Sequence, residues 1–201
     1  MSEVVDVSVP RQSRHVGAYV EMLISSILGL VAAFVLSIDA IALAKDPNAV
    51  LACDINPLIS CGKVGITWQA NLFGWPNSFL GLVTEPIVVT LAVAALGGVK
   101  FPRWFMLTAQ AFYTFGFLFA VWLFLEAYFV IGALCPWCLL ITATTTLVFA
   151  SMTRVNLLDN NFGLKPAAHA RVSRWLNMWF DTYIAVLFLT VIVVMIIVKY
   201  L

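Results

Sequence analysis

The composition of this 201-residue chain excludes an ordinary soluble domain, because 63% of its residues are hydrophobic, only 10% are charged and its mean hydropathy is +1.01. Soluble domains are about half apolar and about a quarter charged. A net charge of +1, without a basic patch interleaved with aromatic residues, excludes a nucleic-acid partner. We therefore expect an all-α integral membrane protein with several spans.

Apolar runs divide the chain into five predicted spans. The polar segment 1–16 comes first, and the apolar run after it is too long for the core of a cleaved signal peptide. The predicted spans cover about 17–44, 79–98, 105–134, 136–153 and 181–198. Two polar connections stand out, 45–77 and the basic segment 154–180. Each span is expected to be a helix, because a single strand leaves its backbone unpaired in lipid.

The distribution of Lys and Arg predicts the orientation. An odd number of spans places the termini on opposite sides of the membrane. The N-terminal side carries eight basic residues: Arg11, Arg14, Lys100, Arg103, Arg154, Lys165, Arg171 and Arg174. The other side carries three: Lys45, Lys63 and Lys199. Because cytoplasmic loops are enriched in Lys and Arg, we predict a plasma-membrane protein with a cytoplasmic N-terminus and an external 45–77 loop and C-terminus.

The motif Cys135-Pro136-Trp137-Cys138 opens the fourth predicted span. Two thiols one helical turn apart can form a small disulfide, and a helix N-terminus stabilises a thiolate. Pro136 suits the first turn, where a missing N–H costs nothing. The structural alternative is two unrelated buried cysteines. The spacing favours a redox or metal function.

The other two cysteines, Cys53 and Cys61, flank a turn-forming Asn56-Pro57 in the 45–77 connection, on the same predicted side as the motif. A structural zinc site is one interpretation, although the C-x₇-C spacing departs from zinc knuckles. Two static disulfides in an oxidising compartment are another. The third is a relay in which the loop pair exchanges with the fixed pair, and the fixed pair passes electrons to a lipid-soluble acceptor. The relay also explains why one pair opens a membrane helix.

These motifs and their order resemble vitamin K epoxide reductase and its bacterial homologues. The resemblance covers about residues 17–153. It rests on Cys53-Asp54, Cys61, the hydroxyl residue Thr67, Asn77-Ser78 at the start of the second span, and the CPWC motif. In the unrelated quinone-linked oxidases of the DsbB type, the C-x-x-C pair precedes the wider pair, whereas here it follows.

The resemblance implies a role for each cysteine. Cys135 and Cys138 would form the active site, with Cys138 nearest a bound quinone and Cys135 exchanging with the loop. Cys61 would attack Cys135, and Cys53 would react with the external partner.

The resemblance also implies a fold and a quinone site. The fold would be a four-helix bundle over 17–153, followed by a cytoplasmic loop at 154–180 and a peripheral fifth helix within 181–201. Asn77 would hydrogen-bond a quinone carbonyl, and Thr67 would help to position the loop.

Two departures from the family pattern refine this expectation. Vertebrate members place a substrate-binding tyrosine where this chain has Thr142, which favours a bacterial member that reduces only quinone, either menaquinone or ubiquinone. Bacterial members often carry a thioredoxin-like domain after the fifth helix. Because this chain stops at Leu201, we expect its partner to be a separate exported thioredoxin-like (DsbA-type) protein.

Two carboxyl groups lie within predicted spans. Glu85 and Glu126 are each about 10 Å below the outer boundary at about 1.5 Å per residue. Intramembrane carboxylates are costly, so both are candidate proton relays; the alternative is a neutral, hydrogen-bonded Glu between helices. Asp39 is expected to be interfacial, and His15 and His169, on the inner side, are expected to be solvated.

The combined expectation is a membrane thiol–disulfide oxidoreductase that oxidises an exported protein, reduces a membrane quinone and so supports disulfide formation. A periplasm is kept oxidising by electron flow to quinone rather than by a redox buffer. Two alternatives stay open: a vitamin K quinone or epoxide reductase, and a non-catalytic membrane scaffold stapled by disulfides.

Overall fold

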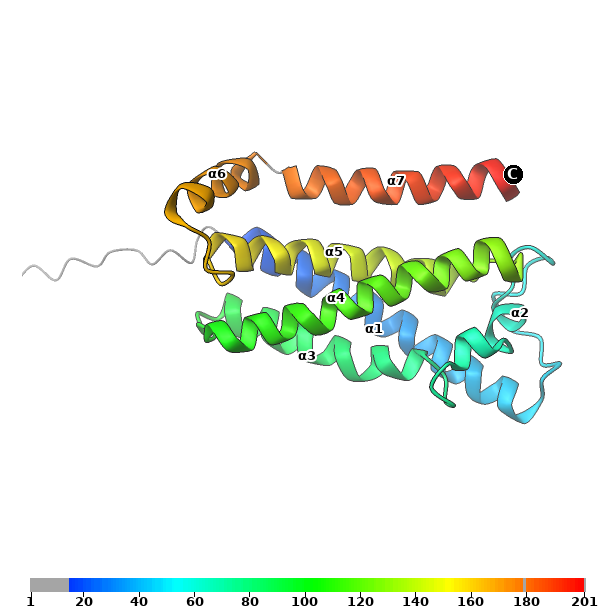
Figure 1. Cartoon of the computed structure of the whole chain (residues 1–201). Helices are drawn as coiled ribbons and strands as arrows, with labels where there is room; N and C mark the ends of the chain where they lie inside the picture. The colour runs from blue at the N-terminus through cyan, green and yellow to red at the C-terminus, as the bar shows by residue number, and fades with distance from the viewer. Residues whose placement is uncertain (1–14, 179, 201) are drawn as a thin grey trace, which may run out of the picture.

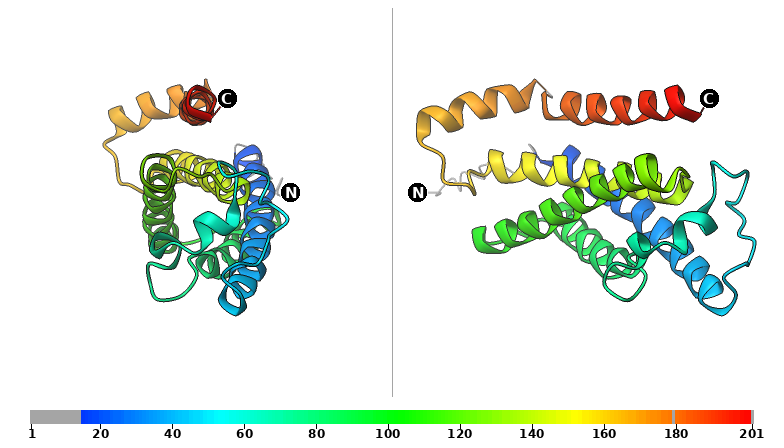
Figure 2. Two further views of the ribbon diagram at one scale, coloured as in Figure 1. Left: turned by 90° about the vertical axis from the view of Figure 1, so that its right-hand side faces the viewer. Right: turned by 45° about the vertical axis from the view of Figure 1, so that its right-hand side comes forward.

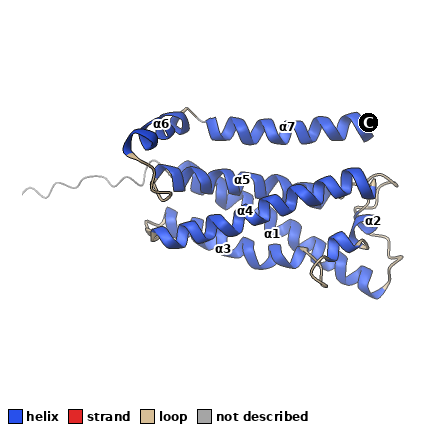
Figure 3. Ribbon diagram, in the orientation of Figure 1, coloured by secondary structure: helices blue, strands red, loops and turns tan. Residues whose placement is uncertain are grey.

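The computed structural model describes residues 15–178 and 180–200, and this part of the chain is helical with no β-strand (Figure 3). Of the predicted segment 1–16, only the last two residues therefore belong to the described part. Five helices are long and apolar enough to cross a membrane. They are α1 (Val16–Lys45), α3 (Ser78–Leu96), α4 (Arg103–Glu126) with its π-helical continuation η3 (Ala127–Ile131), α5 (Pro136–Leu158) and α7 (Phe180–Tyr200). The predicted all-α membrane fold is confirmed.

Helices α1, α3, α4 and α5 form a bundle, and α7 runs along the outside of it (Figure 1). Seen along its length, the bundle has α1, α3, α4 and α5 around one axis, with α7 beyond them (Figure 2). Several side-chain contacts attach α7 to the bundle. Ile192 packs against Phe124 and Tyr128 near the end of α4, and Asp181 pairs with Arg154 of α5 at 3.0 Å. The fifth helix is therefore peripheral, as expected.

The half of the bundle that holds the start of α1 and the end of α5 is filled by large apolar side chains. These include Met22, Leu91, Met106, Val148 and Met152, which are all buried. Towards the other half, which ends at the CPWC motif, α1 and α3 come so close that a Cβ atom on Gly81 would lie 2.6 Å from Cβ of Ala33. Small residues permit such contacts between membrane helices.

The end of the bundle where α1 finishes and α5 begins is covered by the connection between α1 and α3 (Figure 1). This loop contains the short helices α2 (Cys61–Gly65) and η2 (Trp68–Asn71). Its predicted turn is present, because Oδ1 of Asn56 accepts hydrogen bonds from the N–H groups of Leu58 (2.9 Å) and Ile59 (2.8 Å).

Backbone pairing then fixes this turn to the start of α5. The N–H of Ser60 donates to the carbonyl of Leu134 (3.0 Å), and the N–H of Leu134 donates to the carbonyl of Leu58 (2.8 Å). The loop and the CPWC motif therefore share one end of the bundle.

The connection 154–180 is more helical than expected. Helix α5 continues to Leu158, and α6 (Pro166–Asn177) follows it at the end of the bundle opposite the CPWC motif. Pro166 occupies the first turn of α6, where it is well tolerated. Helix α6 is amphipathic: Leu176 is buried and Arg171 is exposed. A search for long apolar runs misses such a helix because its apolar residues occupy one face.

Candidate functional site

The CPWC motif forms the first turn of α5. Cys135 is the N-cap, and the backbone N–H of Cys138 donates a hydrogen bond to its Sγ (3.3 Å). A hydrogen bond from the Cys138 thiol lowers the pKa of Cys135, burial opposes this, and the backbone N–H groups of Cys138 and Trp137 lower it further. Cys135 is therefore well placed to exist as a thiolate, the reactive form of cysteine.

The two cysteine pairs meet at this point. Cys53 and Cys61 form a disulfide, whereas Cys135 and Cys138 are free thiols. Sγ of Cys61 lies 3.2 Å from Sγ of Cys135, and both residues are only 2% exposed. Thiol–disulfide exchange proceeds by attack of a thiolate on a disulfide sulfur. The structure thus places a free thiol against the sulfur with which it would exchange.

The conformation of the loop pair depends on Asp54. Its carboxylate accepts hydrogen bonds from the Ser60 hydroxyl (2.7 Å) and from the N–H groups of Gly62 (2.9 Å) and Leu51 (2.8 Å). Burial would raise the pKa of Asp54, but these hydrogen bonds, with one from the N–H of Cys61, lower it below its ordinary value. Charged Asp54 therefore holds the residues on both sides of the disulfide together.

A cavity of about 380 Å³ extends from the motif into the bundle. This volume is within the range of about 300–1,000 Å³ that is usual for small-molecule sites. Side chains from α1, α3, α4 and α5 line it, and most of them are apolar. The predicted site residues on its wall are Cys61, Thr67, Asn77, Glu85, Cys135 and Cys138. An apolar cavity with few polar groups beside a free dithiol suits a flat, largely apolar ring that carries two carbonyl groups.

Asn77 and Thr67 stabilise the mouth of this cavity. Nδ2 of Asn77 donates to the carbonyl of Gln69 (2.6 Å), and Oδ1 accepts from the N–H of Leu72 (3.3 Å). The Thr67 hydroxyl donates to the carbonyl of Val64 (2.7 Å) and caps η2. An amide has two N–H donors and two acceptor positions. Asn77 therefore keeps capacity for a ligand after these backbone contacts.

The two intramembrane carboxyl groups have different surroundings. Glu85 is 5% exposed, lines the cavity and accepts a hydrogen bond from the Tyr113 hydroxyl (3.0 Å). Glu126 is half-buried, accepts a hydrogen bond from Nε2 of Gln69 (3.1 Å) and does not line the cavity. The structure thus brings Glu85 to the cavity, whereas Glu126 fastens η2 to α4.

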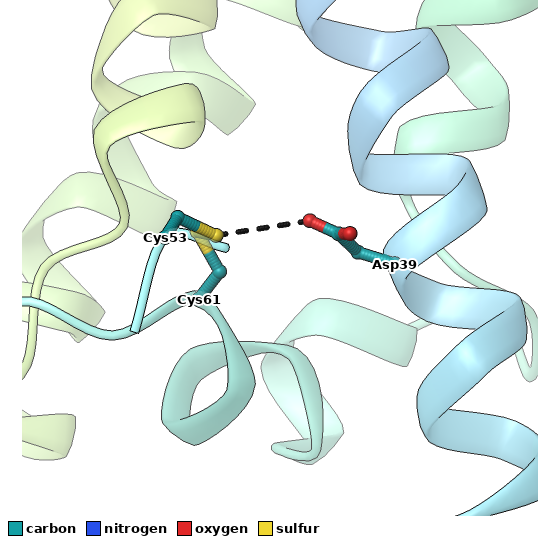
Figure 4. Close-up of side chains that lie close together, drawn as sticks. All are labelled: Asp39, Cys53 and Cys61. Carbon is teal, nitrogen blue, oxygen red and sulfur yellow. Dashed lines mark hydrogen bonds between the residues drawn. A yellow bond between two sulfur atoms is a disulfide. The ribbon is translucent and has the colours of Figure 1, made fainter. Parts of the chain in front are cut away.

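Asp39 is a site residue that the sequence analysis treated as interfacial. It is half-buried in α1, and its Oδ2 lies 3.7 Å from Sγ of Cys53 (Figure 4). The potential metal-binding atoms of Asp39, Cys53 and Cys61 lie within 4.8 Å of one another. While the disulfide is closed, however, its sulfurs are not thiolates, the form in which cysteine binds metal. The one signal in the sequence is an acidic residue near the end of the helix that leads into the cysteine loop.

Both histidines lie beside the end of α5, at the opposite end of the bundle from the thiols. His15 was expected to be solvated, but it is 8% exposed and its Nε2 lies 3.1 Å from Oδ1 of Asp159. The expectation was wrong because the start of α1 lies beside the end of α5. Nε2 of His169 contacts the carbonyl of Leu158 at 3.2 Å.

Comparison with known proteins places this geometry in context. The model of the vitamin K epoxide reductase family matches residues 20–153, which is two thirds of the 201-residue chain. This range contains all four cysteines and the residues that line the cavity. No curated protein matches the chain.

Proposed function

The chain belongs to the vitamin K epoxide reductase family, and from this premise we propose that it oxidises an exported thioredoxin-like (DsbA-type) protein and passes the electrons to a membrane quinone. Members of this family are membrane oxidoreductases that are generally linked to quinones and thioredoxin-like partners. The observation that carries the proposal is the 3.2 Å contact between Cys61 and Cys135 beside an apolar cavity.

The relay follows from the order of the sulfurs. A partner thiolate attacks Cys53, the disulfide breaks and Cys61 leaves as a thiolate. The partner's second thiol then attacks the partner sulfur of this mixed disulfide, which leaves the partner oxidised and releases Cys53. When the motif is oxidised, Cys61 attacks Cys135 and Cys138 leaves. Cys53 then attacks Cys61, which closes the loop disulfide and releases Cys135 as a thiolate. Two electrons from the partner now reside on Cys135 and Cys138, which is the arrangement described above.

The cavity residues supply binding and protons. A quinone, whether menaquinone or ubiquinone, would accept two electrons and two protons from this site when bound. Asn77 would orient a carbonyl group, Thr67 would hold the mouth closed, and the apolar walls would exclude water. We assign proton delivery to Glu85, because it lines the cavity with Tyr113. Glu126 contacts Gln69 instead.

Thr142 supports quinone reduction over epoxide reduction. It occupies the position of the substrate-binding tyrosine of the vertebrate members, and it lines the cavity. Its hydroxyl donates to the carbonyl of Cys138 in its own helix (3.0 Å). A short side chain with its proton engaged in this way offers the cavity no replacement for a phenol.

A test needs purified protein, a reduced thioredoxin-like protein as the probe, and a short-chain quinone. We expect thiol loss that requires quinone, with one quinol formed per dithiol oxidised. Cys138→Ala should abolish turnover; its lone Cys135 should attack Cys61 of the loop disulfide, release Cys53 and accumulate a Cys61–Cys135 disulfide. After cleavage at a protease site engineered into 98–102, this disulfide keeps the two fragments together until reductant is added.

Cys135→Ala serves as the matched control, since it removes one sulfur of the cross-link and its fragments should separate. Unchanged thiols in the presence of quinone would contradict the proposal and favour a disulfide-stapled scaffold.

A further inference from the structure

The Asp39 carboxylate approaches the loop disulfide from α1. Figure 4 shows it directed at the disulfide, with Oδ2 of Asp39 3.7 Å from Sγ of Cys53. This separation is suitable for a hydrogen bond from a thiol, so a reduced Cys53 would be able to donate its proton to Asp39. Cys53 is 8% exposed, which leaves little water to accept that proton instead.

The surroundings of Asp39 supply no cation to pair with it. Within residues 15–178 and 180–200, no Lys, Arg or His forms an ion pair with it. Its neighbour Asp54 in the loop has the same charge. The other ionisable groups near it are the loop cysteines and Cys135 at the start of α5. A half-buried carboxylate beside a second one is destabilising, so the position of Asp39 beside Cys53 points to a chemical role.

We propose that Asp39 is the general base for the step in which Cys53 closes the loop disulfide. The inference rests on the proposed relay and deepens it. The Cys53 thiol gives its proton to the Asp39 carboxylate as its sulfur attacks Cys61. The Cys53–Cys61 bond forms, the Cys61–Cys135 bond breaks, and Cys135 leaves with the electron pair. Negative charge moves from Asp39 to Cys135, and Asp39 then releases the proton to the water at the outer end.

This step needs a base because a thiol is a weak nucleophile. A free cysteine with a pKa of about 8.5 is only about 3% thiolate at pH 7. Burial and two neighbouring carboxylates make a Cys53 thiolate less favourable still. Transfer of the proton during the attack means that no charge ever resides on Cys53. The Cys135 thiolate, by contrast, has the N–H of Cys138 to stabilise it.

The test compares Asp39→Asn with wild type. Both proteins turn over with reduced thioredoxin-like protein and quinone, and samples are quenched with acid during turnover. At pH 7 we expect turnover to fall by about ten- to thirtyfold, the range set by the thiolate fraction of an unassisted cysteine. The Cys61–Cys135 disulfide should accumulate, as detected by fragments that stay linked after cleavage in 98–102. Both differences from wild type should shrink as the pH rises above about 8.5, because a growing fraction of the thiol then ionises without help.

Two further variants make the result specific. Asp39→Glu keeps the carboxyl group and should recover most of the turnover. Asp46→Asn removes an exposed carboxylate just after α1 and should behave as wild type. An Asp39→Asn protein with wild-type turnover and no linked fragments at pH 7 would overturn the proposal, as would a loss of turnover that is equal at every pH. A wild-type protein without quinone-dependent thiol oxidation would instead refute the proposed function.

Discussion

At the residue scale, the carboxylate of Asp54 connects three parts of the cysteine loop. It accepts hydrogen bonds from Leu51 before the disulfide and from Ser60 and Gly62 on either side of Cys61. A Cβ on Gly62 would lie 2.9 Å from Oδ2 of Asp54, so glycine permits this close approach. The loop pair is therefore held in position by a charged group that does not itself exchange electrons.

Asp54→Ala should consequently loosen the loop. Hydrogen bonds to a charged group contribute about 1.5–3 kcal/mol each, and we expect a loss of stability of about 2 kcal/mol. The loop disulfide should be reduced at lower dithiothreitol concentrations than in wild type, as measured by alkylation and mass. Asp46→Asn, an exposed change nearby, should leave the dithiothreitol concentration for half-reduction of this disulfide unchanged. If this concentration in Asp54→Ala equals that of wild type, the backbone pairing with Leu134 is sufficient to hold the loop.

The same carboxylate predicts a dependence on pH. Because the pKa of Asp54 is lower in the folded protein than its ordinary value of about 3.9, the stabilisation by its charged carboxylate is fully present above that value. The stabilisation is lost as the pH falls through the lower, folded pKa. Wild-type protein in detergent should lose melting temperature as the pH falls from about 4 to about 2, at and below the ordinary carboxyl pKa. Asp54→Asn should lose less over this interval, and equal losses would contradict the assignment.

At the scale of elements, the contact between α1 and α3 sets the width of the cavity. Gly81 lines the cavity and also lies against Ala33. Gly116 in α4 lines it too, but a Cβ there would have no neighbour within 4 Å. These two cavity-lining glycines, one in α3 and one in α4, thus differ in the space available for a Cβ atom.

This difference gives a matched pair of substitutions. Gly81→Ala must move α1 away from α3, and overpacking of this kind costs about 1–3 kcal/mol. We expect a lower melting temperature in detergent and a raised quinone KM. Gly116→Ala has room and gains helix propensity of up to about 1 kcal/mol, so its melting temperature should be unchanged or higher. Equal behaviour of the two variants would refute the close approach of α1 and α3.

The elements also separate what the sequence predicts from what it leaves undetermined. Five spans were predictable because each is an apolar run as long as a bilayer is thick. The N-terminal position of CPWC followed from Pro136. The contact of Asp39 with Cys53 was not predictable, because it depends on the rotation of α1 and on the path of the loop. Helix α6 was not predictable as a helix because it is amphipathic rather than long and apolar. The hydrogen bond between Glu126 and Gln69 was not predictable because Gln69 lies in a short helix of the loop.

At the scale of the whole molecule, redox groups and basic groups occupy opposite ends. The cysteines lie at the end of the bundle that carries α2, whereas α6 lies at the other end (Figure 1). Within residues 15–178 and 180–200, six of the nine Lys and Arg residues belong to the segments at the α6 end: Lys100, Arg103, Arg154, Lys165, Arg171 and Arg174. With cytoplasmic loops enriched in Lys and Arg, this separation supports our proposal that the cysteines face outwards. An external dithiol protein would then reach Cys53 without crossing the membrane, and Asp39 would release its proton on the same side.

Two engineered cysteines test this orientation in a chain whose four native cysteines are replaced by serine. Val50 is 87% exposed in the loop at the cysteine end, and Ala168 is exposed on α6 at the other. A membrane-impermeant maleimide added to intact cells should label Val50→Cys, because the loop faces outwards. Ala168→Cys should be labelled only after the membrane is permeabilised. The opposite pattern would invert the topology and place the disulfide in a reducing compartment, where an exported partner is excluded.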